Sequence, residues 1–185
     1  MIAFLDIETT GLSEQYCSIL EIAAIACDAS GEIVTTFHEY INPGKPIPSN
    51  IVQLTRITDD TVRFAKKEWQ VLEELIEWLQ GNGVTELIIH NASFDMRFLR
   101  GRSAKYNLVG SEFNFVCVLD SMKLARELIK KGKFMTYKTG NGQACVKQEV
   151  IAKSLGVEYG EGGAHSAIED VLVLKQIYTK MISMR

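Results

Sequence analysis

The sequence lacks the features that mark a membrane-spanning, secreted or zinc-binding protein. No segment approaches the roughly 18 consecutive apolar residues of a membrane-spanning helix. The amino-terminal stretch MIAFL meets a carboxylate at residue 6 instead of continuing as a secretory signal. The 4 cysteines never form a C-x-x-C pair and the 3 histidines are scattered, which argues against a structural zinc site. We therefore expect a cytoplasmic protein with reduced thiols.

Proline and net charge are also sparse. The only prolines are Pro43, Pro46 and Pro48, which predict one extended loop. The formal net charge is −3, whereas many nucleic-acid-binding proteins are basic. Binding depends more on where charges cluster than on their sum. With 46% hydrophobic and 23% charged residues, the chain has the composition of a soluble globular protein, and we expect one domain, 1–185.

Five segments have the composition of β-strands. The first three follow one another, and residues 28–31, DASG, form a hairpin signal between the second and the third. The later strands alternate with helical segments, which predicts an α/β fold with a mixed five-stranded sheet flanked by helices. The predicted strands are residues 2–8, 18–27, 32–41, 86–90 and 113–120. The predicted helices are a short one capped at Thr58, 69–79, one directly after residue 90, 121–129, 146–155 and 166–182, with a loop over 131–144.

Four acidic residues lie in apolar surroundings, where an ionised carboxylate is costly to bury unless it is paired or bound to a metal. Asp6 and Glu8 are two residues apart in a predicted strand, so their side chains point to the same face. Asp95 and Asp170 lie near helix starts, and each alone is typical of residues that complement the helix dipole. Together the four supply the oxygen ligands that two Mg²⁺ or Mn²⁺ ions require, and paired ions of this kind hydrolyse phosphodiesters.

His165 is a candidate general base beside these acids. Ser166 and Glu169 match the S-x-x-E capping box, which places the helix N-cap at Ser166 and His165 just outside the helix. Three glycines within 160–163 predict a mobile approach to it. A lone histidine is more often structural or on the surface. A histidine on a glycine-rich segment beside a carboxylate is a better candidate for accepting a proton.

Three motifs stand in order along the chain: FLDIETTGL (4–12), HNASFDMRFL (90–99) and HSAIED (165–170). Together they resemble the motifs of the DEDDh family of 3′–5′ exonucleases, which is DnaQ-like and includes polymerase proofreading subunits, ribonuclease T and oligoribonuclease. The resemblance implies a ribonuclease H-like fold. It also implies hydrolysis at the 3′ end of a nucleic acid with release of 5′-mononucleotides.

The resemblance further implies roles for individual residues. The acids would ligate two divalent cations, with Asp6 bridging both, and His165 would activate the attacking water. Leu12 would wedge against the last base. The implied metal ligands are Asp6, Glu8, Asp95 and Asp170, and the implied substrate-binding residues are Thr9, Thr10, Leu12, Asn91 and Phe94.

Two segments depart from the family pattern. Many relatives carry L-T-G-I-T before the first long helix, whereas residues 54–58 read LTRIT, with Arg56 replacing the glycine. Residues 131–145 are longer and more basic than the usual loop. They belong to a basic stretch, 123–147, that interleaves Phe134 and Tyr137 with its cations. Such a stretch suits a single-stranded backbone and its bases, and a solvated lysine-rich loop is equally consistent with it.

Three function classes fit these patterns. They are an exonuclease, a catalytically inactive nucleic-acid-binding module of the same fold, and an unrelated metal-binding or structural α/β domain. Retention of all five catalytic positions favours the enzyme. DNA is favoured over RNA as substrate because DIETTGL followed by HNASFD most resembles proofreading-type relatives, with an exoribonuclease as the alternative. The expected partner is a nucleic acid 3′ end, not a membrane, and the sequence leaves open association with a polymerase or with a second copy.

Overall fold

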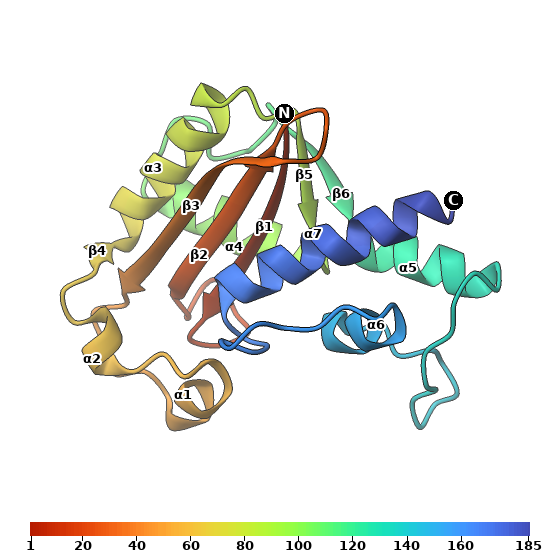
Figure 1. Ribbon diagram of the computed structural model, residues 1–185. Coiled ribbons are helices and arrows are strands. Elements are labelled where there is room, and N and C mark those ends of the chain that lie inside the picture. Colours follow the sequence, from red (N-terminus) through yellow and green to blue (C-terminus); the bar gives the residue numbers. More distant parts are fainter.

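The computed structural model describes residues 1–185 and contains one mixed six-stranded sheet with helices on both faces (Figure 1). The strand order across the sheet is β4-β3-β2-β1-β5-β6. β1, β2 and β3 are antiparallel neighbours, and β5 pairs in parallel with both β1 and β6. The strands are β1 Ile2–Thr9, β2 Ile19–Cys27, β3 Ile33–Asn42, β4 Lys66–Lys67, β5 Glu86–Ile89 and β6 Cys117–Asp120.

The predicted α/β class and mixed sheet are confirmed, but the predicted number of strands is wrong. The additional strand, β4, has 2 residues, too few for an alternating pattern to reveal, and lies at the edge beside β3. The predicted strand 113–120 is extended only over its last residues. Phe113 is fully buried with a φ of 52°, so the chain turns there and the aromatic side chain enters the core before the strand begins.

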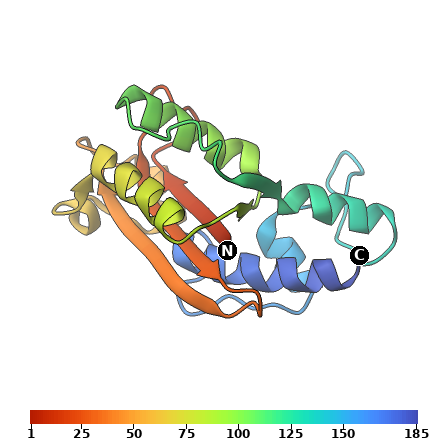
Figure 2. The same cartoon turned by 90° about the horizontal axis from the view of Figure 1, so that it is seen from above.

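Seven helices complete the fold, and five of them divide between the two faces of the sheet (Figure 2). α3 and α4 cover one face, and α5, α6 and α7 lie on the other. α1, which the sequence did not predict, follows the proline-rich loop. No helix has both the length and the apolar character needed to cross a membrane. The helices are α1 Ser49–Thr55, α2 Asp59–Val62, α3 Glu68–Gly81, α4 Ala92–Lys105, α5 Ser121–Lys130, α6 Gln148–Ser154 and α7 Ala167–Ser183.

The alternation of side chains along β1 decides where its acids lie. Ala3, Leu5 and Ile7 join the core beneath α3 and α4, whereas Phe4 joins the core beneath α5, α6 and α7. Because successive side chains point to opposite faces of a strand, the even-numbered acids of β1 share the face of Phe4. α7 crosses this face, packing on both β1 and β2. The carboxyl end of β1 therefore presents its acids to the start of α7.

Candidate active site

Three of the predicted metal ligands meet at the carboxyl end of β1. Suitable oxygen atoms of Asp6, Glu8 and Asp170 all lie within 4.8 Å of one another. Asp6 and Glu8 come from β1, and Asp170 comes from the first turn of α7. The antiparallel core of the sheet and the helix that crosses it thus bring together carboxylates that are more than 160 positions apart in the chain.

The fourth predicted ligand, Asp95, lines the same cleft but lies outside this tight group. It is 3% exposed and belongs to the first turn of α4. α4 starts almost directly after β5, which is the parallel neighbour of β1, so its first turn stands beside the carboxyl end of β1. The negative charge of Asp95 acts on Asp6 across this junction and raises its pKa.

Burial raises the pKa of all four carboxyl groups. For Asp6, burial is the largest cause, followed by repulsion from the other three acids and from Glu21, and the pKa lies well above its usual range. Burial and then neighbouring carboxylates raise the pKa of Glu8 to about 8, and burial raises that of Asp95 to about 8. Burial also raises the pKa of Asp170. Divalent cations with hard oxygen ligands would relieve this repulsion, so the donor set fits such ions.

Three hydrogen-bond donors orient the carboxylate of Asp170. Gln148 Nε2 and the Tyr159 hydroxyl each donate to its Oδ1 at 2.9 Å. The backbone N–H of His165 donates to its Oδ2 at 2.9 Å. Sequence reasoning missed Gln148 and Tyr159, because neither lies in one of the three motifs and no spacing relates them to Asp170. Donors that orient a ligating carboxylate are a common second layer of metal sites.

His165 precedes α7 as predicted, but the predicted capping box is wrong. Ser166 is the N-cap, yet its side chain makes no capping hydrogen bond. Glu169 instead accepts a hydrogen bond from the backbone N–H of Gly160 at 3.1 Å. Gly162 lies so close to this side chain that an added Cβ would stand 2.7 Å from Glu169 Cγ. These glycines therefore let the chain pack against α7.

Arg56 links α1 to the segment that carries His165. Its Nη1 donates to the carbonyl of Gly162 at 2.6 Å. Arg56 is the C-cap of α1 and has a left-handed backbone with a φ of 63°. Glycine adopts that conformation at low cost, and here an arginine adopts it at the position where the family pattern has glycine. The arginine side chain at this position contacts the segment that precedes His165.

The predicted substrate-binding residues line two adjoining cavities. The larger, of about 640 Å³, contains the four acids, His165, Asn91 and Phe94. The smaller, of about 400 Å³, also borders Glu8 and Phe94. Leu12 stands at the rim of the smaller one with 81% of its surface exposed. The predicted residues in the smaller cavity are Thr9, Thr10, Leu12 and Phe94.

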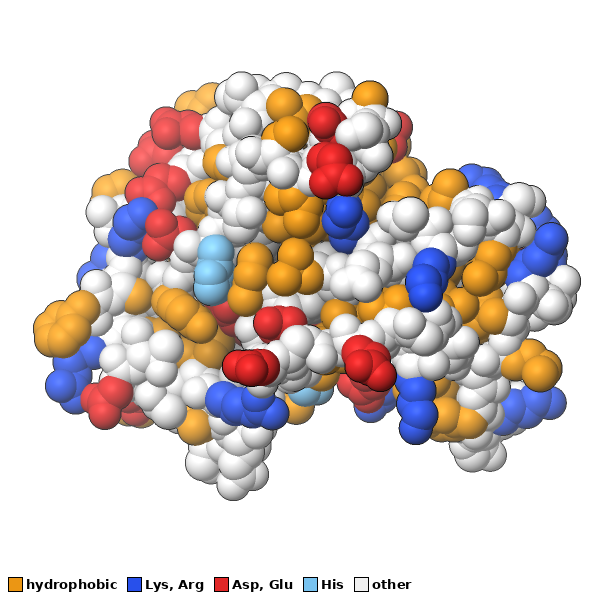
Figure 3. All heavy atoms as spheres, viewed as in Figure 1, with side chains coloured by type: hydrophobic (Ala, Val, Ile, Leu, Met, Phe, Trp, Pro, Cys, Tyr) orange, Lys and Arg blue, Asp and Glu red, His pale blue; other side chains and the backbone are white.

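The basic loop forms part of the wall of the larger cavity. Lys138 pairs with Ala144 as an isolated antiparallel bridge, and residues between 139 and 149 line the cleft. His90 holds this wall, because its Nε2 donates to the carbonyl of Val146 at 2.8 Å. Its Nδ1 lies 2.8 Å from the hydroxyl of Ser121, and burial lowers the pKa of the imidazole. On the face seen in Figure 3, basic side chains border acidic ones and form no continuous patch.

A family model described as an exonuclease, RNase_T, matches residues 3–178 of this chain. The chain belongs to this exonuclease family. It is 35% identical over 177 residues to the DNA polymerase III PolC-type proteins of Staphylococcus epidermidis and Staphylococcus aureus. Those alignments cover 96% of this chain but only 11% of each relative.

Solved structures of Exonuclease I share the fold of this exonuclease-family chain. The apo structure superposes with a TM-score of 0.83 at 18% identity, covering 100% of this chain and 42% of that one. The E. coli Exonuclease I complex with a dA16 oligonucleotide gives a TM-score of 0.79 at 18% identity, covering 100% of this chain and 41% of that one. The predicted ribonuclease H-like architecture is thereby confirmed.

The metal-free protein is expected to lose stability as pH rises. Folded Glu8 and Asp95 have pKa values of about 8, above the ordinary values of 4.5 and 3.8. The folded state therefore binds more protons than the unfolded state between these values, and the stability this gives is lost as pH rises through the folded pKa. In EDTA, the Tm should fall between about pH 5 and about pH 8. Asp95→Asn should flatten the fall and the exposed control Glu73→Gln should not; a Tm that rises over this range would contradict the account.

Replacing Arg56 should separate backbone strain from the contact with Gly162. Arg56→Ala keeps the left-handed backbone without glycine's freedom, so it should be less stable than Arg56→Gly by roughly 1 kcal/mol in urea unfolding. Both variants lose the hydrogen bond to Gly162, so both should speed amide hydrogen exchange over residues 160–165 by the same factor. Unchanged exchange in both variants would show that the arginine does not hold this segment.

Proposed function

We propose that this chain is a metal-dependent 3′–5′ exonuclease that hydrolyses the terminal phosphodiester bond of DNA and releases 5′-mononucleotides. The observation that carries the proposal is the group of partly buried carboxylates with oxygens within 4.8 Å of one another, in a chain of the exonuclease family. Residues 1–185 would form a single catalytic domain acting in the cytoplasm.

The proposed metal ligands are the four acids, which would hold two divalent cations, Mg²⁺ or Mn²⁺. Bound there, the ions would stabilise charge that develops on the phosphate. The raised pKa values of Glu8 and Asp95 support this assignment, because these groups are held where their ionised forms lack compensation. Gln148 and Tyr159 would keep Asp170 in one orientation while it binds.

His165 is the proposed general base. Its backbone N–H donates to Asp170, which fixes the backbone of His165 beside the acids. Histidine is the side chain best suited to exchange protons near neutral pH, and a ring nitrogen of His165 would take the proton of the attacking water. The water oxygen then forms the new bond to phosphorus as the bond to the 3′ oxygen of the penultimate nucleotide breaks. The contacts of Glu169 and Arg56 with the preceding segment would set the approach of the imidazole.

The terminal nucleotide is proposed to occupy the smaller cavity, with Thr9 and Thr10 beside it and Leu12 wedged against its base. Phe94 would complete this pocket from the start of α4, and Asn91 would face the nucleotide from the adjoining larger cavity. Opening a terminal base pair costs a few kcal/mol, so single-stranded or frayed ends should be preferred. Arg126 and Lys147 line the larger cleft on either side of the loop 131–145 in the sequence, whereas Lys131, Lys133 and Lys138 of the loop do not line it. Arg126 and Lys147 would follow the rest of a single strand.

DNA is proposed over RNA because the relatives at 35% identity are DNA polymerases, and because the fold is shared with Exonuclease I bound to dA16. The PolC-type relatives also favour a polymerase as partner over self-association. An exoribonuclease is the alternative within the same chemistry. An inactive binding module is disfavoured, because every acid of the predicted set lines one cleft with His165.

Digestion of matched 5′-labelled DNA and RNA oligonucleotides tests the proposal. With Mg²⁺ or Mn²⁺ we expect shortening from the 3′ end one nucleotide at a time, faster on DNA. Asp6→Asn removes a ligand charge at nearly constant volume, so it should abolish digestion while the Tm in EDTA stays at or above that of the wild type. Glu73→Gln, an exposed carboxylate of α3, serves as the matched control. Undiminished digestion in excess EDTA would overturn the proposal.

A further inference from the structure

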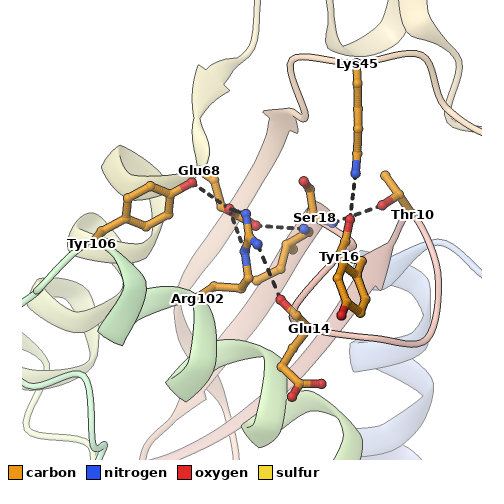
Figure 4. Close-up of polar contacts among 9 residues, drawn as sticks. Thr10, Glu14, Tyr16, Ser18, Lys45, Glu68, Arg102 and Tyr106 are labelled. Carbon is orange, nitrogen blue, oxygen red and sulfur yellow. Dashed lines mark hydrogen bonds and ion pairs between the residues drawn. The ribbon is translucent and has the colours of Figure 1, made fainter.

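The loop between β1 and β2, residues 10–18, is held largely through its backbone and exposes two large side chains. Leu12 and Tyr16 are 81% and 77% exposed. The carbonyl oxygens of three alternate loop residues each accept a hydrogen bond from a cationic side chain, and Figure 4 shows the contacts at Glu14 and Tyr16. The pairs are Arg97 Nη2 to Leu12 O at 3.0 Å, Arg102 Nη1 to Glu14 O at 3.3 Å and Lys45 Nζ to Tyr16 O at 2.7 Å.

One of these cations belongs to a buried ion pair. The side chains of Arg102 and Glu68 are 6% and 4% exposed. Glu68 Oε2 accepts from Arg102 Nε and from the Tyr106 hydroxyl, each at 2.9 Å, and also from Arg102 Nη2. Arg102 and Tyr106 come from α4 and its C-cap, and Glu68 from the first turn of α3. The guanidinium that reaches the loop is therefore fixed from the side facing the core.

The same carboxylate holds the far end of the loop. The register between β1 and β2 shifts between Glu8 and Thr9. Just beyond this irregularity, Glu68 Oε1 accepts the backbone N–H of Ile19 at 2.9 Å. A single buried ion pair thus binds the loop near its middle, at Glu14, and at the residue where β2 begins.

Stability alone does not account for this arrangement. Buried ion pairs can often be replaced by apolar residues of similar volume without loss of stability, because desolvation offsets the attraction between the charges. What apolar residues cannot reproduce are the hydrogen bonds to Glu14 O and Ile19 N. The loop is also tightly folded on itself, since a Cβ on Gly11 would lie 2.8 Å from Cys17 Sγ. The polar cluster is specialised for fixing one loop conformation.

We propose that Glu68, Arg102 and Tyr106, together with Arg97 and Lys45, are positioning residues that make the Leu12 loop a rigid wedge at the 3′ end. This inference rests on the proposed function. A wedge separates the last base from its neighbour only if moving the wedge aside costs more than unstacking the base. α4 carries both Asp95 and two of the loop's donors, so the helix that contributes to the acid cluster also sets the wedge.

The double variant Arg102→Met/Glu68→Gln tests the inference with no change in net charge. Met fills the volume of the arginine without a donor for Glu14 O, while Gln keeps one oxygen as acceptor for Ile19 N and can donate from its Nε2 to the Tyr106 hydroxyl. We expect KM for a single-stranded oligonucleotide to rise roughly tenfold, the equivalent of about one hydrogen bond, with kcat near that of the wild type. Activity on a blunt G·C-rich duplex should fall further, widening the preference for single strands.

A surface variant keeps the test valid if the buried pair proves necessary for folding. Lys45→Met removes only the donor to Tyr16 O, and should raise KM several-fold and speed hydrogen exchange over residues 12–18. The matched control Lys66→Met removes a lysine that pairs with Glu39 and Glu74 and does not touch the loop, and it should change neither quantity. Mn²⁺ affinity should be unaffected in all three variants.

The outcomes separate this inference from the function on which it rests. If wild-type protein shows no metal-dependent digestion from the 3′ end, the proposed function fails. If wild type digests and both loop variants keep its KM, its strand preference and its hydrogen exchange, the function stands and the wedge-positioning role is overturned.

Discussion

Repulsion among buried carboxylates at the carboxyl end of β1 is the constraint around which the protein is organised. Asp6 is surrounded by other acids, and burial together with their charges holds its pKa far above the ordinary range. Such a cluster destabilises a metal-free fold, so the rest of the chain must offset its cost. It does so with two apolar cores, one on each face of the sheet, that include Ala3, Phe4, Leu5 and Ile7 of β1 and most of β2. The same strand that carries the acids is thus among the most securely packed elements.

The surroundings of the acids act mainly by fixing position. Gln148, Tyr159 and the His165 amide fix Asp170, whereas Arg56 and Glu169 fix the segment before α7. The Arg102–Glu68 pair fixes the loop that follows β1. These contacts lie on different elements, yet each holds backbone or carboxylate atoms at the border of one site. In the proposed mechanism, these contacts hold the two-metal centre and the terminal base in a fixed position relative to each other.

Local pattern was enough to predict the acids and most of the sheet. The alternation of β1 placed Asp6 and Glu8 on one face, and helix-start signals placed Asp95 and Asp170 in the first turns of helices. Local pattern failed where contacts between residues far apart in the chain decide which partner a side chain takes. Glu169 left the predicted capping box because Gly160 offers it a different donor. The hydrogen-bond partners of Arg56, Glu68 and Gln148 lie 106, 49 and 22 positions away along the chain, respectively. No local spacing encodes such pairs.

The most direct test of this account is the number of protons released when metal binds. With Glu8 and Asp95 at pKa values of about 8, both are largely protonated at neutral pH, and ligation must displace those protons. Mn²⁺ titration calorimetry at about pH 7, in buffers of different ionisation enthalpy, should show release of at least about one proton per chain, diminishing above about pH 9. Metal binding with no net proton release at neutral pH would contradict the claim that buried, mutually repelling carboxylates form the site.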